Sequence, residues 1–392
     1  MDPLRFVLDL ASPSSVGGET LKAELAEAVD RALPPGCQGF VLCRPEQAAR
    51  AAFEHLEAIP IETPLASRLQ KQRWQLQGLP HWVDRLEVDV TFAASGYFSR
   101  RLHLASAVVT TTNNMLPFMP GPFGPRSLAA RGRQALQRAV TVRCLRRAER
   151  VLLHSRHALH AIEPYVPGLA AKTIVTPTGI PRDARLPHPA PEHPYGGRPY
   201  FLYFSPLKPY KNHLLLIEAY RQLLDRCGSG EEIPDLLFIG HGSSTTYRDQ
   251  IESTIRAGSL DERVRYLGEL PRGPIVAWLH HATVNVFPSL CETSSLIQAE
   301  ILGAGGVMAA SDLPPMNEMP RGTAVFFDPY EAGDIAGAME RLWLDAAASE
   351  ALRESALREA PLRTWAPCGS TLWRLADEAM GERRSSSRRG SG

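Results

Sequence analysis

Short apolar runs alternate with longer segments of helical periodicity along most of this 392-residue chain, in two successive series. Apolar runs of about four to eight residues predict buried strands. Strands that alternate with helices predict βα units and a parallel sheet covered on both faces. The first series has its predicted strands at 5–10, 39–43, 89–95, 105–112, 150–155 and 172–178. The second has them at 200–205, 235–240, 264–268, 284–287, 306–310 and 324–328, with helices near 212–226, 246–257, 273–281 and from 294.

Residues 181–199 separate the two series. They are rich in Pro, His and Gly and have no periodicity, which is typical of a linker. The length also exceeds that of one ordinary core. We therefore predict an α/β protein with two doubly wound, Rossmann-like domains, 1–180 and 200–363, facing a cleft. Ligands of such sheets bind outside the carboxyl ends of the strands.

Composition excludes several classes of protein. With 44% apolar and 22% charged residues, the chain is typical of a soluble globular protein. A net charge of +1 indicates no nucleic-acid partner. The scattered cysteines, without a C-x-x-C pair, favour a reduced cytoplasmic protein over a disulfide or zinc framework. The N-terminus is unlike a secretory signal, and no apolar stretch reaches the roughly 20 residues that span a bilayer. Any membrane contact would be peripheral, at the inner face.

The segment "PSLCETSSLIQAEILGAGG" (288–306) contains two carboxylates eight positions apart, Glu292 and Glu300. The first N–H groups of a helix lack partners and lie at its positive end, so they bind anions. A pyrophosphate could rest on Ser294, Ser295 and Leu296, with Glu300 on the hydroxyls of a ribose and Glu292 facing a sugar. The alternative is an ordinary capped helix with two surface glutamates.

Lysine usage supports the binding interpretation. Of 43 basic residues only five are lysines, and Lys208 and Lys211 stand together just after a predicted strand. A lysine ammonium is a frequent point-charge partner of phosphate. The alternative here is a solvated turn.

Two further segments could bind anions. Gly17 and Gly18, between the first strand and first helix, would let the backbone approach a phosphate, although a Gly-Gly turn alone is weak evidence. Residues 126–150 hold eight arginines and one acid, with interleaved apolar residues. This stretch could touch anionic lipid or an anionic acceptor, or be the solvated face of a helix.

No metal or cofactor site is predicted. The chain contains no D-x-D, the clustered carboxylates that usually hold a nucleotide diphosphate through a metal. The histidines of "HSRHALH" (154–160) have poor spacing for one metal and are interpreted as structural.

Residues 287–329 resemble the donor-site region of retaining GT-B glycosyltransferases, family 4 in particular, in which an E-x7-E pair lies just before and within a helix. The segments "FLYFSPLKPYKNHLLLIEAY" (201–220), "LLFIGHG", "VRYLGEL", "VGGET", "NNMLPF", "RVLLHSRHALHAI" and "TPTGI" resemble the same family. The resemblance covers nearly the whole chain. It implies that 200–363 binds a nucleotide sugar and that 364–380 is a helix crossing back to the first domain. The polar tail 381–392 is predicted to be disordered.

The resemblance implies roles for individual residues. Glu292 and Lys211 would be catalytic, with Glu292 on the donor sugar and Glu300 on the ribose. The donor-binding set comprises Gly17, Gly18, Ser205, Lys208, Lys211, Gly240, Glu292, Ser294, Ser295, Leu296 and Glu300. The family often has an Arg where Ser205 and Pro206 stand, so Lys208 would substitute for it. The family also often has His where Asn113 aligns; Asn113 and Asn114 are the acceptor-side residues.

The expected activity is metal-independent, retaining transfer of a hexose from a nucleotide-diphosphate sugar, without a cofactor. The acceptor would be a hydroxyl of a glycan, a lipid-linked saccharide or a small molecule, as in polysaccharide biosynthesis. Two alternatives remain: a nucleotide-sugar epimerase of the same fold, and a non-catalytic sugar-nucleotide-binding membrane scaffold.

Overall fold

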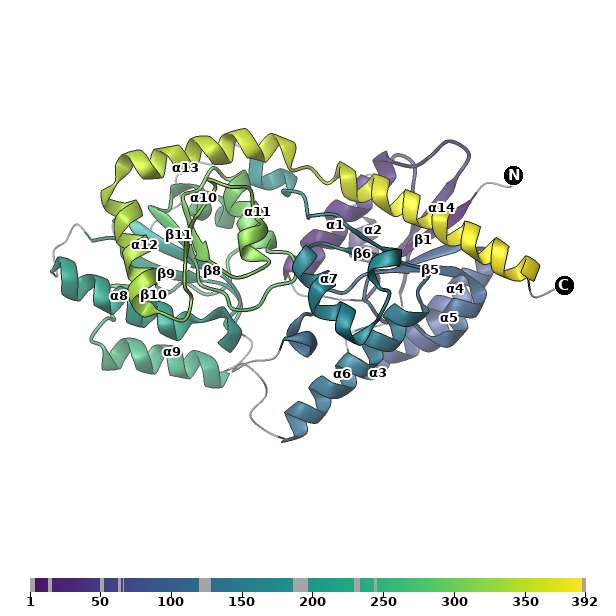
Figure 1. Cartoon of the computed structure of the whole chain (residues 1–392), viewed down its shortest axis with the longest axis horizontal. Coiled ribbons are helices and arrows are strands. Elements are labelled where there is room, and N and C mark those ends of the chain that lie inside the picture. Colours follow the sequence, from purple (N-terminus) through teal and green to yellow (C-terminus); the bar gives the residue numbers. More distant parts are fainter. Residues whose placement is uncertain are drawn as a thin grey trace. The chain divides into compact units, whose positions relative to one another are not determined.

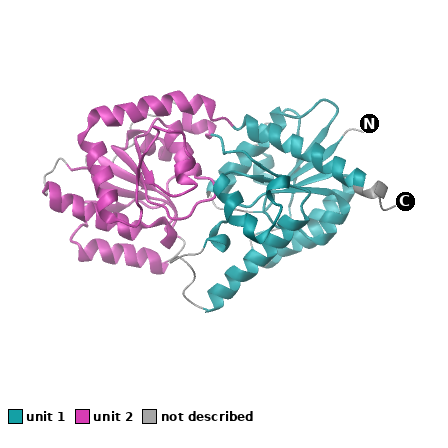
Figure 2. Cartoon of the chain, viewed as in Figure 1, with its two compact units in different colours: residues 1–179, 365–392 teal, residues 180–364 magenta. Residues whose placement is uncertain are grey.

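The computed structural model describes residues 4–12, 16–49, 53–62, 65, 67–119, 128–185, 197–228, 233–242 and 245–389. The chain divides into two compact units (Figure 2). Unit 1 comprises residues 1–179 and 365–392, and unit 2 comprises 180–364. The first break lies one residue before the predicted end of the first domain, whereas unit 2 begins at Ile180, twenty residues before the predicted start of the second domain at 200.

Unit 1 contains a seven-stranded parallel sheet of order β3-β2-β1-β4-β5-β6-β7. Its strands are β1 (Arg5–Asp9), β2 (Gln38–Cys43), β3 (Glu57–Pro60), β4 (Val90–Ala93), β5 (Ala107–Thr110), β6 (Arg150–Leu153) and β7 (Thr173–Val175). The apolar runs predicted all of these except β3. That strand lies at the sheet edge with only Ile59 buried, so it lacks the apolar run of an inner strand.

Helices surround this sheet (Figure 1). The label η marks short helices of other types: η1 is a π-helix, and the others are 3-10 helices. The helices are α1 (Val16–Arg31), α2 (Pro45–Ala48), α3 (Arg68–Arg73), η1 (Trp74–Gly78), α4 (Leu79–Arg85), α5 (Arg100–Ala105), η2 (Leu116–Phe118), α6 (Leu128–Arg147), α7 (Arg156–Ile162), η3 (Glu163–Tyr165), η4 (Ala170–Lys172) and α14 (Ala366–Arg389). α14 packs on α1: Trp373 Nε1 donates to the Val29 carbonyl at 2.9 Å. A Cβ at Gly369 would lie 2.1 Å from the Ala28 carbonyl oxygen, so this close approach requires glycine.

The prediction of a disordered tail is wrong for residues 381–389, which continue α14. Two charged residues of this stretch, Glu382 and Arg383, have partners elsewhere in unit 1. Arg150 pairs with Glu378 at 2.8 Å and with Glu382 at 2.6 Å. Arg383 donates to the His103 carbonyl at 2.9 Å. The polar composition of this stretch gives no indication of these long-range contacts. The last three residues lie outside the described part of the chain.

Unit 2 contains a six-stranded parallel sheet of order β10-β9-β8-β11-β12-β13. Its strands, all predicted, are β8 (Tyr200–Phe204), β9 (Asp235–Ile239), β10 (Val264–Tyr266), β11 (Val284–Phe287), β12 (Met308–Ser311) and β13 (Val325–Phe327). The helices are η5 (Arg182–Arg185), η6 (Pro209–Lys211), α8 (His213–Cys227), α9 (Thr245–Ala257), α10 (Arg272–His281), α11 (Leu296–Gly303), η7 (Met316–Glu318), α12 (Ala332–Leu344), α13 (Ala346–Glu359) and η8 (Ala360–Leu362).

The start of the predicted linker belongs to unit 2. η5 begins at Arg182, and the Ile180 amide donates to the Arg363 carbonyl at 2.9 Å. Residues 186–196 lie outside the described part of the chain, and β8 begins at Tyr200. Among the described residues, no helix has both the length and the apolarity to cross a membrane.

The order of the unit 2 sheet reverses between β8 and β11, which are direct neighbours. Successive connections leave in opposite directions at such a point, and the loops beyond the two carboxyl ends leave room for a ligand. These loops are residues 205–212 and 288–295. They contain Lys208, Lys211 and Glu292, so the topology brings much of the predicted donor site to one place.

Candidate functional site

The loops that follow β8 and β11 are joined by two contacts. The Leu290 amide donates to the Tyr210 carbonyl at 2.9 Å. The Lys211 ammonium forms an ion pair with the Glu292 carboxylate. The two predicted catalytic residues are therefore direct partners, 81 positions apart in the sequence.

The Lys211–Glu292 pair is largely withdrawn from solvent. The side chains are 5% and 15% exposed. The Lys211 ammonium also lies 5.6 Å from the ring centroids of both Tyr210 and Phe287, within the range of a cation–π contact. A charge in such surroundings interacts more strongly with a ligand charge than one in water. Burial, followed by the charge of Glu292, raises the pKa of the adjacent Cys291 thiol to about 12, so this cysteine stays protonated.

Helix α11 begins at Leu296, four residues after Glu292. Its N-cap is Ser295, in the left-handed region with φ of 49°. No side chain caps the helix at this residue: Ser295 Oγ accepts no capping bond and is buried without a partner. The first amide bonded back into the helix is that of Ala299, which donates to the Ser295 carbonyl. The preceding amides, those of Leu296 and the next two residues, lie at the positive end of the helix.

Ser294 is half-buried and directly precedes this N-cap. A non-glycine residue in the left-handed region costs of order 1–3 kcal/mol and persists only where its surroundings impose it, often at binding sites. The turn at Ser295 therefore fits an anion-binding start of α11.

Glu300 is 2% exposed, and its Oε1 accepts a bond of 2.6 Å from Arg272 Nη1. The same guanidinium donates to both oxygens of Asp183, at 2.8 Å from Nε and 3.1 Å from Nη2. Sequence analysis missed Arg272 and Asp183. The signal that could have found Arg272 is its place at the start of a helix after β10, together with the need of a buried carboxylate for a cationic partner.

Ser205 and Gly240, both in the predicted donor-binding set, are close neighbours in the structure. Ser205 is fully buried, and its hydroxyl lies 3.1 Å from His213 Nε2. Gly240 has φ of 149°, and a Cβ there would lie 2.0 Å from the Ser205 carbonyl oxygen. Burial and the nearby Lys211 charge lower the pKa of His213 to about 3. Lys208, half-buried, precedes η6.

Gly17 and Gly18 lie in the first turn of α1, in unit 1. Close to them in the sequence, the buried Lys22 joins the loop after β1 to the helix. Its ammonium donates to the Ser12 carbonyl and lies 3.6 Å from a Glu19 carboxylate oxygen. Burial lowers the pKa of Lys22, and the charge of Glu19 opposes this shift. The role of the two glycines in donor binding stays a prediction.

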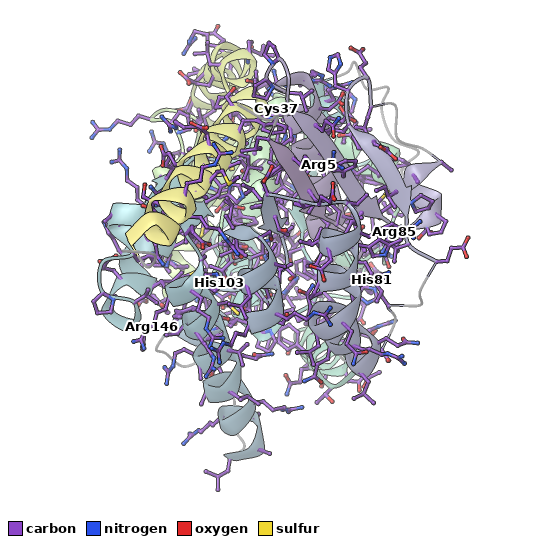
Figure 3. All side chains as sticks on the ribbon, turned by 90° about the vertical axis from the view of Figure 1, so that its right-hand side faces the viewer. Arg5, Cys37, His81, Arg85, His103 and Arg146 are labelled. Carbon is purple, nitrogen blue, oxygen red and sulfur yellow. The ribbon has the colours of Figure 1, made fainter. Side chains whose placement is uncertain are left out.

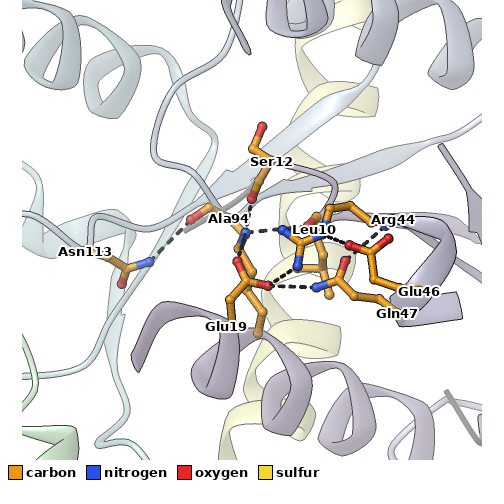
Figure 4. A network of polar contacts seen from close by, with 9 residues as sticks. Leu10, Ser12, Glu19, Arg44, Glu46, Gln47, Ala94 and Asn113 are labelled. Atoms are coloured by element: carbon orange, nitrogen blue, oxygen red, sulfur yellow. Dashed lines mark hydrogen bonds and ion pairs between the residues drawn. The ribbon is translucent and has the colours of Figure 1, made fainter. Parts of the chain in front are cut away.

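The acceptor-side candidates follow β5. Asn113 is exposed, and its Nδ2 lies 3.4 Å from the Ala94 carbonyl oxygen (Figure 4). Asn114 Oδ1 accepts from the Leu116 amide at 3.2 Å, so this side chain supports η2. Of the two, Asn113 is the better placed to contact an acceptor, and both roles stay predictions. Among the described residues, no group of three or more His, Cys, Asp or Glu is arranged to hold a metal.

The basic stretch forms α6, from residue 128 to 147; residues 126 and 127 lie outside the described part. Figure 3 shows side chains standing on this helix, with Arg146 near its end. Only Thr141, Cys144 and Leu145 are buried. Leu128 and Leu136 are 84% and 55% exposed. The predicted amphipathic pattern therefore buries a face only near the C-terminus of α6, and the rest exposes both arginines and leucines.

Comparison with known proteins finds a family model that matches part of the chain. Residues 187–359 match the family "Glycosyl transferases group 1". A curated relative, the 2-deoxystreptamine N-acetyl-D-glucosaminyltransferase of Niallia circulans, is 26% identical over 160 residues. That match covers 40% of this chain and 39% of the relative, so the chain matches about two fifths of the relative's length.

Solved structures resemble the chain over almost its whole length. A sucrose-phosphate synthase from Thermosynechococcus elongatus has a TM-score of 0.73 at 17% identity, covering 97% of this chain and 100% of that one. Anabaena HepE in complex with UDP-glucose has a TM-score of 0.70 at 15% identity, covering 98% and 100%. An α,α-trehalose-phosphate synthase from Burkholderia xenovorans has 0.69 at 13%, covering 95% and 100%. At these identities the likeness concerns the fold, and it confirms the predicted one.

Proposed function

We propose that this chain transfers a hexose from a nucleotide-diphosphate sugar to an acceptor hydroxyl, with retention of configuration. The GT-B fold and the match of residues 187–359 to the glycosyl transferases group 1 family support this proposal. The observation that carries the proposal is the Lys211–Glu292 pair beside the start of α11, at the point where the sheet order of unit 2 reverses. A cation, a carboxylate and open helix amides there match the phosphate and hydroxyl groups of such a donor.

In this proposal Lys211 and the α11 amides bind the diphosphate. Negative charge accumulates on the diphosphate as its bond to the sugar breaks, and a preorganised ammonium and helix dipole stabilise that charge. Glu292 accepts hydrogen bonds from hydroxyls of the donor sugar. Catalysis then rests on positioning and charge stabilisation, and the leaving phosphate accepts the acceptor proton.

Glu300 would bind the two hydroxyls of the donor ribose. Its place in α11, about one turn beyond the Leu296 amide, suits the distance between a diphosphate and its ribose. A buried, ionised carboxylate makes strong hydrogen bonds to hydroxyl groups.

The acceptor is proposed to be a glycan, a lipid-linked saccharide or a small molecule. The Niallia circulans relative is named for a small aminocyclitol acceptor and an N-acetylglucosaminyl donor, so such compounds are reasonable first probes. Uridine-linked donors come first because HepE was solved with UDP-glucose. The exposed arginines and leucines of α6 support a weak contact with anionic membranes, which a lipid-linked acceptor would require.

A thermal-shift screen of nucleotide sugars identifies the donor first, since a ligand at 100 times its Kd should add about 2.7 kcal/mol of stability. Product analysis with that donor, labelled in the sugar, follows. A new glycoside with the anomeric configuration of the donor supports the proposal. An epimerised nucleotide sugar formed without acceptor indicates the epimerase alternative. Binding without any product indicates the non-catalytic alternative.

A further inference from the structure

Arg272 connects two carboxylates from different elements of unit 2. It is the first residue of α10, and its side chain is 25% exposed. Two of its nitrogens donate to Asp183, in η5, and the third donates to Glu300, in α11. The Glu300 side chain is only 3% exposed, so water hardly reaches its carboxylate. Arg272 is the partner of one of the two carboxylate oxygens, Oε1.

The geometry of the Asp183 contact fixes the guanidinium plane. Two parallel N–H···O bonds to one carboxylate hold an arginine in a defined orientation, which a lysine cannot reproduce. With Nε and Nη2 used in this way, Nη1 is the nitrogen that meets Glu300. Burial lowers the pKa of Arg272, but the bonds to Asp183 and Glu300 outweigh burial and hold this pKa above its ordinary value. The guanidinium therefore stays cationic between the two carboxylates.

We propose that Arg272, anchored by Asp183, is a positioning residue that holds the Glu300 carboxylate in the orientation that recognises the ribose hydroxyls of the donor nucleotide. The inference rests on the proposed function, in which Glu300 is the ribose-binding group. Arg272 itself would touch neither the sugar nor the diphosphate. Its effect would therefore be confined to the ribose.

A purely structural role is the rival interpretation, because the same bonds tie η5 to α10 and α11. The two roles differ in what they change. A structural defect weakens every ligand of the site alike, whereas a misplaced Glu300 weakens only those ligands that carry the ribose hydroxyls. The ratio of affinities for ribose and deoxyribose nucleotides separates them.

The experiment uses the full-length protein and calorimetry. Uridine, guanosine and adenosine diphosphates are first compared, and the tightest is then compared with its 2′-deoxy and 3′-deoxy forms. The wild type should prefer the ribose compound by about ten- to a hundredfold, as expected for a hydrogen bond to a charged group. In Arg272→Gln this preference should fall below about threefold, while the affinity for the deoxy compounds changes little.

Matched variants sharpen the test. Arg221→Gln removes an arginine that also bonds two carboxylates, Glu218 and Asp225, but on the exposed face of α8, and it should leave the preference unchanged. Asp183→Asn keeps Arg272 but weakens its anchor, so the preference should fall part of the way. In a Glu300→Gln background, Arg272→Gln should change the preference no further, because one residue acts through the other.

Each outcome has a defined meaning. Equal weakening of ribose and deoxyribose compounds in Arg272→Gln, or an unchanged preference in both that variant and Asp183→Asn, overturns the positioning role. Should Arg272→Gln fail to fold, Arg272→Lys and Asp183→Asn decide in the same way. A wild type that binds nucleoside diphosphates without preferring ribose contradicts the role proposed for Glu300. A wild type that binds none of them contradicts the proposed function itself.

Discussion

Replacing Lys211 by alanine should have two separable consequences, because this lysine has two partners in the proposed complex. In the ligand-free chain it pairs with Glu292, and in the complex it also binds the diphosphate. Removing one member of a buried ion pair leaves the other charge uncompensated, at a cost of about 3–5 kcal/mol. Since the Glu292 side chain keeps 15% of its exposure, the lower end of that range applies, about 3 kcal/mol. For units of 150–250 residues, this corresponds to a fall in Tm of roughly 6–12 °C.

The second consequence concerns the ligand. Loss of a charge-assisted contact should weaken nucleoside diphosphate binding by about 1.5–3 kcal/mol, which is roughly ten- to over a hundredfold. Adding Glu292→Gln to Lys211→Ala removes the uncompensated carboxylate. The double variant should therefore regain most of the lost stability and none of the lost affinity.

The assays are thermal unfolding without ligand and calorimetry with the nucleoside diphosphate. Lys208→Ala is the matched control, because it removes the other lysine of the same loop, and it should cost less in both assays. The reasoning is refuted if Lys211→Ala leaves stability and affinity unchanged, or if Glu292→Gln restores the affinity. In the first case the diphosphate site lies elsewhere, and in the second Lys211 acts only by neutralising Glu292.

Three further outcomes are expected. Turnover should survive a chelator nearly unchanged, because the sequence has no D-x-D; a large loss that magnesium or manganese reverses would contradict this. Segment 126–150 should bind anionic vesicles weakly and only at low salt, since exposed charges are screened within about 10 Å at 0.1 M ionic strength. If the protein does not co-sediment with such vesicles even at low ionic strength, this segment has a structural role only. Burial lowers the pKa of His213 to about 3, whereas a histidine in the unfolded chain titrates near 6.5. Between these two pH values the His213 imidazole is therefore protonated only in the unfolded chain. The free energy of unfolding therefore loses nothing from His213 above about pH 6.5 and decreases as the pH drops towards 3, by about 2 kcal/mol at pH 5. In urea titrations, the free energy of unfolding of His213→Gln should decrease less steeply with falling pH than that of the wild type. An identical decrease would contradict the assignment.

The sequence predicted the fold well because its inner strands are buried on both faces. Strands such as β9 consist entirely of buried residues, so their apolar runs are unambiguous. Strand β3 was missed because it is short, lies at an edge and keeps Glu57 exposed. The meeting of Lys211 and Glu292 could also be anticipated, since parallel strands with reversed order bring the loops after their carboxyl ends together.

Contacts that depend on distant parts of the chain could not be predicted in this way. Arg272 is one of many arginines, and nothing in its local sequence indicates that it lies against Glu300. Asp183 falls in a Pro-rich segment that composition assigns to a linker. Ser295 has the residue type of a helix cap, but its backbone is left-handed and its side chain makes no capping bond. Each of these features arises when the tertiary fold overrides a local preference.

The donor site is tested most directly by comparing Glu292→Gln with Glu300→Gln. Both variants keep the size of the side chain and remove its charge. Glu300→Gln should weaken the bare nucleoside diphosphate and the nucleotide sugar alike, by roughly tenfold or more, because both ligands carry the ribose. Glu292→Gln should leave nucleoside diphosphate affinity intact and lower kcat, because its contact to the sugar strengthens as the glycosidic bond breaks.

Calorimetry with the nucleoside diphosphate, beside steady-state rates with the identified donor, measures both effects in the same preparations. We predict an affinity loss confined to Glu300→Gln and, in Glu292→Gln, a loss of rate at unchanged nucleoside diphosphate affinity. The opposite assignment, with nucleotide affinity lost in Glu292→Gln and only rate lost in Glu300→Gln, would show that the two roles are exchanged. Two variants that both bind and turn over like the wild type would contradict a donor site at the start of α11.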